Sequence, residues 1–462
     1  MKKNKLFLPL LFTALSLPLF AEGGVEFSGS VESLWGIKAP WIESNAAGRF
    51  SLGDTSLTSS LDAYFGNSSA FAKGSISYDA LQTEKGMDAL DFSLGELWID
   101  YTDSFWGVRI GRQKTAWGKA DGIDITNVIC PSDMSSFSSL VGDDSKLAID
   151  AIRLSFNGSS FTADAYWIPF FTPTKLPLEE GNSLRSFLVP SSVEFPIEAL
   201  GTSLTLPVSI NDFEKPEMAI WNGEYGLKLS GYFSLFDLSF YAFYGWDDLP
   251  FLDYSLTYNS GTPTMPNGIL VGGEYSHMAM LGLDAAIPLG ETVLRLETAF
   301  FPERHFQKSA EKIFEEKITA QTKAALTGSP VEKVDVSEKH NELSALAGLD
   351  WMPSSWTITA QYFCDYLFGN LENLERDDAY THGATLSISK TVLNETLELS
   401  FSALVNFNAF DSLLAPSVNY SLSDQIKLGC TAYIFIPGPT KDGEYGVYKD
   451  LSSICISASF SF

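Results

Sequence analysis

Residues 453–462, at the end of the chain, read SICISASFSF, and their hydrophobicity alternates with a period of two. Ile454, Ile456, Ala458, Phe460 and Phe462 share one parity, while serine and cysteine fill the other. Because successive side chains of a β-strand point to opposite faces, this pattern predicts a strand with one apolar and one polar face. A half-buried strand of a soluble protein has the same pattern, so this segment alone does not fix the surroundings of the apolar face.

The same alternation recurs along the chain, clearly in residues 237–247 and 395–405. Each segment is about ten residues long, which is the length that a tilted strand needs to cross a bilayer. In total, 18 candidate strands are predicted. They lie near 25–35, 56–64, 70–78, 90–101, 105–113, 146–156, 160–167, 224–234, 237–247, 272–287, 291–301, 341–351, 355–367, 380–389, 395–405, 411–421, 424–436 and 453–462. The parity breaks near Leu94–Leu97 and Asp150–Arg153, where we expect a β-bulge or an inaccurate strand assignment.

The connections between the predicted strands fall into two groups. Every second connection is short, such as 235–236 and 422–423. The others are mostly long, and only 406–410 is short among them. The long connections are 36–55, 114–145, 168–223, 248–271, 302–340 and 437–452. Short turns at one rim and long loops at the other are typical of outer-membrane barrels. The fold predicted for residues 22–462 is therefore an all-β, transmembrane, antiparallel up-and-down β-barrel of about 18 strands (16–18).

Residues 1–21 have the pattern of a signal peptide, and we predict that they are removed on export. Three lysines precede an apolar run at 6–20, and Ala21 follows as the last residue before cleavage. The run is short for a membrane-spanning helix, although an anchored helix is the alternative. No later run of about 18 apolar residues occurs, so the exported chain is either soluble or crosses a membrane with strands.

The composition excludes several classes of protein. The 462 residues carry a net charge of −27, which repels nucleic acid, and 13% of them are aromatic, which excludes a disordered acidic tail. No G-x-S-x-G or other nucleophile motif occurs, and the four histidines and four cysteines are scattered without metal-ligand spacing. We therefore predict no enzyme, no cofactor and no metal site. Cys430 and Cys455 have opposite predicted parity, so no disulfide is expected between them.

Aromatic residues gather at the ends of the predicted strands, as in the interfacial girdles of membrane barrels. The set is Trp35, Trp98, Tyr101, Trp106, Trp167, Trp246, Trp351, Trp356, Tyr366 and Phe368. The chain also ends on Phe462, and an aromatic last residue on an alternating strand resembles the assembly signal of bacterial outer-membrane barrels. Outer-membrane lipid is therefore one expected partner.

Barrels of about 16–18 strands leave an aqueous channel, so the inward parity is expected to line a lumen. That parity carries charges of both signs, with more acids than bases, which predicts a weak preference for cations. The candidate lumen charges are Glu32, Asp62, Arg295, Glu297 and Asp350. The alternative is that these charges only solvate the wall and pair with one another.

Residues 108–137 depart from the alternation. This segment begins as a strand, leaves it at Gln113, and continues with turn residues such as Trp117-Gly118 and Asp121-Gly122. It also holds the densest basic group of an acidic chain. A long outside loop folded inward would narrow the pore. The candidate constriction residues are Arg109, Arg112, Lys114, Trp117, Lys119 and Asp121. The alternative is an ordered loop, packed by Trp117 and Ile123, that contacts no solute.

Part of this segment resembles a known family. Gly111-Arg112-Gln113, Trp117-Gly118, Asn127 and Pro131-x-Asp133 are similar to an element of a family of large, mostly uncharacterised Gram-negative outer-membrane barrels. That family is itself distantly similar to porins and alginate-export barrels. The motif lies within residues 111–133, and the rest of the chain matches in architecture only. The resemblance implies an outer-membrane channel or exporter, and it supplies no substrate.

Two other long loops are expected to cover the mouth of the barrel. Residues 168–223 are rich in proline and apolar residues, which predicts a loop folded back as a lid or plug, with a path for hydrophobic substrates as the sharper alternative. Within the loop 302–340, residues 306–326 change to helical spacing, and Gly328 follows near the end. This spacing predicts a short helix resting on the barrel mouth.

The function that the sequence predicts is an outer-membrane porin or channel for the passive passage of small polar solutes or ions. A transporter of hydrophobic compounds and a surface adhesion or structural barrel are the two alternatives. Small solutes are the other expected partners, and no nucleic acid is expected. The sequence leaves open the substrate, the ion selectivity, the direction of transport, the oligomeric state and whether the lumen is open or plugged.

Overall fold

The computed structural model describes residues 23–40, 45, 47–84, 88–137, 145–179, 182, 184–197, 202–259, 262–439 and 443–462. The signal peptide predicted for residues 1–21 lies outside the described residues. All distances and exposed fractions given below refer to the described part of the chain.

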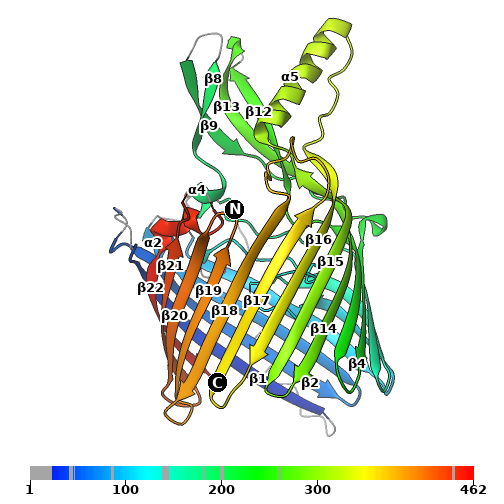
Figure 1. Cartoon of the computed structure of the whole chain (residues 1–462), viewed down its shortest axis with the longest axis vertical. Helices are drawn as coiled ribbons and strands as arrows, with labels where there is room; N and C mark the ends of the chain where they lie inside the picture. Colours follow the sequence, from blue (N-terminus) through cyan, green and yellow to red (C-terminus); the bar gives the residue numbers. More distant parts are fainter. Residues whose placement is uncertain are drawn as a thin grey trace.

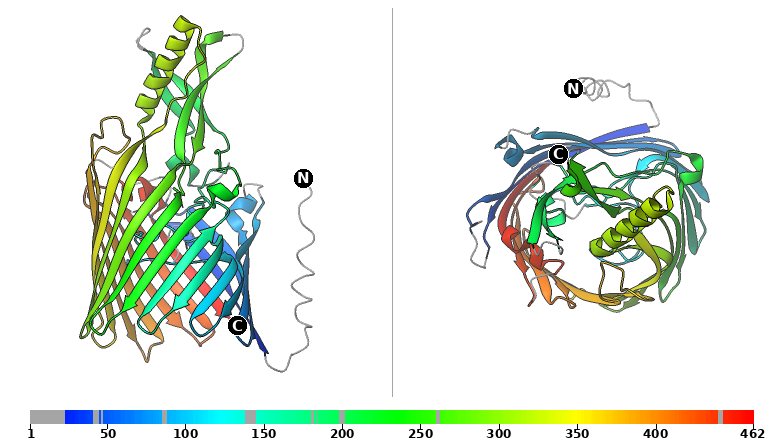
Figure 2. Two further views of the ribbon diagram at one scale, coloured as in Figure 1. Left: turned by 90° about the vertical axis from the view of Figure 1, so that its right-hand side faces the viewer. Right: turned by 90° about the horizontal axis from the view of Figure 1, so that it is seen from above.

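Eighteen antiparallel strands form one closed barrel, which confirms the predicted fold (Figures 1 and 2). Each strand pairs with its sequence neighbours in the barrel, and β1 pairs with β22 to close the ring. At this seam, Gly29 and the last residue, Phe462, exchange two backbone hydrogen bonds of 2.9 Å. The strands of the barrel are β1 (Gly23–Lys38), β2 (Phe50–Phe65), β3 (Ser68–Asp79), β4 (Leu90–Thr102), β5 (Trp106–Gln113), β6 (Ile149–Asn157), β7 (Phe161–Ile168), β10 (Glu224–Tyr232), β11 (Asp237–Trp246), β14 (His277–Leu289), β15 (Thr292–Gln307), β16 (Ser337–Trp351), β17 (Trp356–Leu367), β18 (Tyr380–Val392), β19 (Leu397–Asn406), β20 (Asp411–Ser421), β21 (Ile426–Ile436) and β22 (Ser453–Ser461).

The outer face of the barrel is apolar, and the inner face is largely polar. In β14, Leu281 and Leu283 are 51% and 42% exposed on the outside, whereas Met280 and Asp284 have the inward parity and are buried. Closure of the ring leaves no barrel strand with an unpaired edge, which is the condition for a sheet to lie in lipid. The apolar outer face therefore suits the hydrocarbon layer of a membrane.

The two predicted breaks in parity have different explanations. At Leu94–Leu97, Lys73 of β3 pairs with Glu96 and Gly74 pairs with Leu94, so Gly95 is an extra residue in a β-bulge. The bulge keeps Leu94 and Leu97 on the same outward face. At Asp150–Arg153, β6 pairs with both neighbours without any shift in register. The pattern looked irregular there because Ala151 faces inward although it is apolar, and it packs in a buried cluster.

The predicted sorting of the connections is confirmed, since short turns lie at one rim and long segments at the other (Figure 1). One strand prediction needs correction. Residues 272–287 were expected to form a single strand after a loop at 248–271, but β13 (Thr262–Glu274) ends before β14 begins at His277. Together with β12 (Phe251–Asn259), β13 belongs to a separate sheet outside the barrel.

This outer sheet has four strands in the order β12-β13-β9-β8, with β8 (Ser192–Ile197) and β9 (Thr202–Ile210) coming from the 168–223 loop. It projects beyond the rim that carries the long connections (Figures 1 and 2). Leu206, Ile269 and Val271 form its buried core. The lid or plug expected for residues 168–223 is therefore corrected in part, because the apolar residues of β9 are buried within the outer sheet instead of in the lumen.

The helix expected near 306–326 is α5 (Ala310–Thr327), which lies beside the outer sheet (Figure 1). It begins later than predicted because β15 continues to Gln307, and Ser309 then caps its first turn by accepting the N–H of Lys312. Gly328 ends it with a φ of 69°. The shorter helical elements are α2 (Ala80–Glu84), α4 (Arg185–Leu188), η3 (Ile220–Asn222) and η4 (Gly446–Leu451). Among the described residues, no helix is both long enough and apolar enough to span a membrane.

The predicted aromatic girdle is present on the outside at several strand ends. Trp35, Trp351 and Trp356 are 40–44% exposed there. Trp98 departs from the prediction, because it lies between the outward-facing Leu97 and Ile99 and stacks on Phe71 at 5.3 Å between ring centroids. Trp98 therefore belongs to the inner wall.

Candidate pore constriction

The segment that follows β5 lies inside the barrel and is bound to the wall by the carboxylate of Glu297 in β15. One carboxylate oxygen, Oε2, accepts the backbone N–H groups of Lys119 and Ala120 at 2.7 and 2.9 Å. The other, Oε1, accepts the N–H and the hydroxyl of Thr126 at 2.8 and 2.7 Å. Glu297 is 3% exposed, so one buried carboxylate holds two separate turns of the segment against the wall. We call residues 114–137 the inward loop.

Gly118 lets the inward loop approach Glu297 closely. Its φ is 84°, and a Cβ at this position would lie 2.4 Å from Glu297 Oε1. The N–H of Gly118 donates to the hydroxyl of Tyr241 at 3.1 Å, and that hydroxyl donates to Asp284 at 2.5 Å. Any larger residue at position 118 would therefore push the loop away from β11, β14 and β15 together.

Two further side chains of the wall bind the backbone of the inward loop. Arg295 donates from Nη1 to the carbonyl of Lys119 at 2.6 Å and from Nη2 to Asp350 at 2.6 Å. Gln361 of β17 accepts the N–H of Asp121 at 2.9 Å and donates to its carbonyl at 2.7 Å. These contacts fix the path of the loop through its backbone, and the side chain of Asp121 remains exposed.

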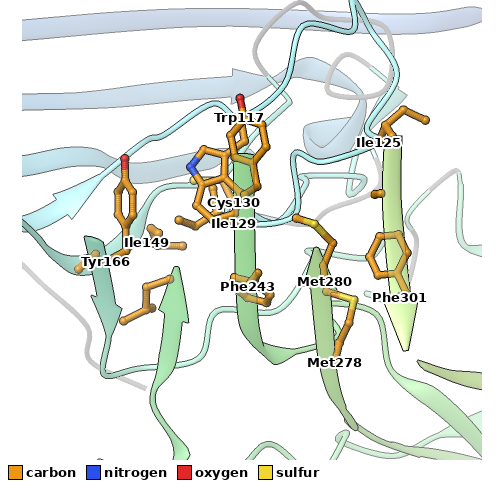
Figure 3. Packing of buried hydrophobic residues seen from close by; sticks show 14 of the residues in the cluster. Trp117, Ile125, Ile129, Cys130, Ile149, Tyr166, Phe243, Met278, Met280 and Phe301 are labelled. Atoms are coloured by element: carbon orange, nitrogen blue, oxygen red, sulfur yellow. The ribbon is translucent and has the colours of Figure 1, made fainter. Parts of the chain in front are cut away.

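An apolar cluster fills the space between the inward loop and the wall (Figure 3). Trp117 is 3% exposed, and its ring centroid lies 5.2 Å from that of Tyr241 and 6.0 Å from that of Tyr166. Ile129 of the loop and Met280 of β14 are buried in the same cluster. Full burial of a large apolar side chain contributes about 1.5–3 kcal/mol, so the cluster and the hydrogen bonds both hold the loop in place.

Cys130 lies in this cluster, and its thiol is shielded from solvent. Its sulfur accepts the N–H of Thr115 at 3.3 Å. Burial raises the pKa of Cys130 to about 11, and the hydrogen bond from Thr115 opposes that shift. All four cysteines are free, which agrees with the expected absence of a bridge between Cys430 and Cys455.

The end of the inward loop reaches a different part of the barrel wall. Phe137 packs on Tyr433 and Phe435 of β21, with ring centroids 5.7 and 6.2 Å away. Leu184, which precedes α4, and Leu451, which ends η4, are buried in the same cluster. The outside end of the lumen is therefore crossed by chain between β5 and β21.

The structure brings together only some of the predicted constriction residues. Trp117, Lys119 and Asp121 lie on the part of the inward loop that binds β11–β17. Lys114 begins the loop, and its N–H donates to Glu96 of β4 at 2.9 Å.

The two arginines lie in the strand. Arg109 belongs to the inner wall, where it pairs with Asp100 at 2.8 Å and covers the ring of Trp98 at 3.7 Å. Arg112 has the parity of Ile110, which is 52% exposed on the outer face, and it pairs with Asp150 at 3.1 Å. Arg112 is therefore separated from the inward loop by the strand itself.

The five predicted lumen charges divide into two groups. Arg295, Glu297 and Asp350 lie beside the inward loop, and Arg295 pairs with Asp350 at 2.6 Å. Glu32 and Asp62 lie on β1 and β2, with the inward parity and without contact to the loop. The first group positions the loop, whereas the second group lies on the inner wall of β1 and β2.

Sequence reasoning missed Tyr241 and Gln361 as residues that bind the loop. Both are polar residues at inward positions of strands that were predicted, and both are buried. A large polar side chain on the inward face is the only signal in the sequence, and it does not reveal which segment covers it. Within the described ranges, no group of three His, Cys, Asp or Glu residues is placed to hold a metal ion.

The closed ring, its apolar outside and the loop bound within it define a membrane-spanning β-barrel of the outer-membrane type. The chain belongs to the family described as "Protein of unknown function (DUF1302)", whose model matches residues 50–425. No curated protein matches the chain. The predicted similarity to alginate-export barrels stays a prediction.

Several solved outer-membrane proteins are similar in structure. OccAB2 of Acinetobacter baumannii is 7% identical, with a TM-score of 0.49, and the match covers 95% of this chain and 98% of that one. OccK8 (OprE) of Pseudomonas aeruginosa is 10% identical, with a TM-score of 0.48 and coverage of 95% and 97%. The outer membrane channel DcaP of Acinetobacter baumannii is 9% identical, with a TM-score of 0.42 and coverage of 96% and 99%.

Proposed function

We propose that the protein is an outer-membrane porin through which small polar solutes and ions pass by diffusion. The observation that carries this proposal is the attachment of residues 117–126 of the inward loop to one side of the barrel wall. The side chains that hold residues 117–126 come from β11, β14, β15 and β17. Most inward side chains of β18–β20 and β1–β3 remain partly exposed, and Leu52 and Asp411 near the outside rim are buried. Residues 117–126 therefore narrow the lumen on one side and leave much of the polar wall on the other side uncovered, while Phe137 reaches β21 near the outside end.

The direct test is to insert the purified, refolded protein into a planar lipid bilayer between two KCl solutions and to measure its conductance. Folding is checked first by heat-modifiable migration in detergent, which a closed barrel shows and an aggregate does not. We expect discrete open-channel steps and swelling of protein-containing liposomes in a monosaccharide solution. A folded barrel that gave no conductance and no swelling would overturn the proposal.

The charges of the open side predict a weak preference for cations. Glu32 and Asp62 lie on this wall, and Glu26 pairs opposite Asp62. In a tenfold KCl gradient we expect a reversal potential of about 10–20 mV, with the sign that indicates a preference for K⁺ over Cl⁻, because fixed acids of the wall attract cations. The double variant Glu32→Gln/Asp62→Asn should bring the potential closer to zero, whereas Glu332→Gln, in an exposed ion pair beside α5, should leave it unchanged. Clear anion selectivity of the wild type would contradict this prediction.

The alternative functions have less support. A transporter of hydrophobic compounds would use an accessible apolar path, but Trp117 and the apolar residues of β9 are packed in buried clusters. A folded barrel that admits no sugar but takes up an apolar dye would favour that alternative. The outer sheet with α5 is the observation that favours an adhesion barrel (Figure 1). Binding of a surface or matrix ligand by a non-conducting barrel would favour it.

A further inference from the structure

The inner wall of the barrel has two unlike halves. On β11–β17 the inward side chains are covered by the inward loop, and Tyr241, Asp284, Glu297 and Gln361 are at most 4% exposed. On β18–β22 and β1–β3 most inward side chains are partly exposed, and buried ones such as Leu52, Asp411 and Phe435 lie near the outside rim. A solute that crosses the barrel therefore meets the second half directly.

Hydroxyl groups dominate this accessible half. We call it the hydroxyl face. Its members share the inward parity, because they alternate along each strand with apolar residues of the outer face. They are Ser28, Ser30, Ser56, Thr58, Ser60, Ser75, Ser77, Thr385, Ser387, Ser389, Ser400, Ser402, Ser417, Thr431, Ser457, Ser459 and Ser461.

The strand register brings these hydroxyls next to one another across the wall. Ser387 pairs opposite Ser402, and Ser400 pairs opposite Ser417, on three consecutive strands. The hydroxyls of Ser400 and Ser417 lie 2.5 Å apart. Across the closing seam, Ser30 of β1 lies opposite Ser461 of β22, so the face continues past the point where the ring closes.

Several charged side chains of these strands lie near the rim with the short turns, while Asp54 and Asp79 lie opposite each other towards the other rim. Glu26 and Asp62 lie opposite each other near the rim with the short turns, and Glu398 and Lys427 are each the second residue of a strand that leaves a short turn. On β18–β22 the middle of the hydroxyl face is uncharged, whereas Glu32 of β1 and Lys73 of β3 place charges there on the other strands.

We propose that the hydroxyl face favours neutral, polyhydroxylated solutes, the chemical class of sugars and polyols. This inference rests on the proposed porin function. A hydroxyl side chain offers one donor and two acceptors, so a row of them can replace the water around the hydroxyls of a solute as it moves. A charged solute loses part of its hydration in the narrowed lumen and finds no matching charge in the middle of β18–β22.

The first test compares solutes of nearly equal size in liposome swelling with the wild-type protein. Glucose is neutral, glucosamine is a cation and gluconate is an anion. We expect the rate for glucose to exceed both charged rates by about threefold, because only the neutral solute exchanges water for wall hydroxyls without losing charge hydration. Equal rates, or a faster rate for either charged solute, would overturn the inference.

The second test removes part of the face. The variant Ser387→Ala/Ser400→Ala/Ser402→Ala/Ser417→Ala should lower the glucose rate about two- to threefold while KCl conductance stays near the wild-type value. The matched control is Ser59→Ala/Ser412→Ala, two serines with the outward parity, which should change neither quantity.

The outcomes separate the two proposals. A wild-type channel that conducts KCl but shows no preference for glucose leaves the porin function standing and overturns the inference. A folded barrel without any conductance overturns both. An unchanged glucose rate in the four-serine variant would mean that the hydroxyl face does not contribute to selection, and this result also overturns the inference.

Discussion

The variant Glu297→Ala is expected to conduct ions about twofold better than the wild-type protein, because pore width sets conductance and this residue holds the narrowing loop. The substitution removes the carboxylate that accepts four hydrogen bonds, three from backbone N–H groups and one from the hydroxyl of Thr126. These donors would then have to turn towards water in the lumen. Single-channel recording in symmetric KCl measures the change, and greater current noise should accompany it.

A change in charge alone must be separated from release of the loop. Glu398→Ala is the matched control, because it also removes an inward acid and the known contacts of the inward loop do not involve it. If both variants change conductance equally, the charge and not the loop is responsible. Glu297→Gln should have an intermediate effect, because the amide keeps one acceptor oxygen of similar position. An unchanged conductance in Glu297→Ala would contradict the assigned role of this carboxylate.

Arg304→Met should lower the free energy of unfolding by about 3 kcal/mol, since removing one partner leaves buried charges uncompensated. A register shift between Phe301 and Arg304 turns the guanidinium towards two acids. Its Nε lies 2.8 Å from Asp247, and its Nη1 lies 2.9 Å from Glu342. The side chains of both acids are at most 7% exposed. Glu342 keeps a second arginine, Arg376, at 3.4 Å, so the loss falls mainly on Asp247, where water cannot replace the lost partner well.

Urea unfolding in lipid vesicles, followed by the heat-modifiable band, measures this loss. Lys323→Met is the matched control, because it also removes a cation from an ion pair. In that pair the side chains of Lys323 and Glu332 are 58% and 70% exposed. That variant should change the free energy of unfolding by less than about 1 kcal/mol. Equal stability of both variants would contradict the importance of the Arg304 network.

The barrel could be predicted well because each strand faces two different solvents. The outward Leu281 is apolar and the inward Asp284 is charged, and the alternating sequence pattern shows this contrast directly. The outer sheet could not be separated in the same way. The strands β13 and β14 are both 13 residues long and only two residues separate them, so length alone does not distinguish a strand in lipid from a strand outside the barrel.

The candidate constriction was predicted only in part, for a related reason. Turn residues after Gln113 indicate that the chain leaves the wall, and local chemistry is enough for that conclusion. The partners of the loop are far away in the sequence, since Asp121 binds Gln361 across 240 positions. Arg112 illustrates a smaller error, because its basic charge suggested the lumen although its position in β5 has the outward parity.

The pairing of β1 with β22 has a consequence for biogenesis. The first strand finds one of its two neighbours only when the last residues of the chain exist, and Phe462 itself bonds to Gly29. Until then the growing sheet has two open edges that can pair with any other chain. Contacts between distant parts of a chain also form slowly. The ring therefore cannot close before β22 is available, and a sheet that has paired only in part exposes edges that favour aggregation until then.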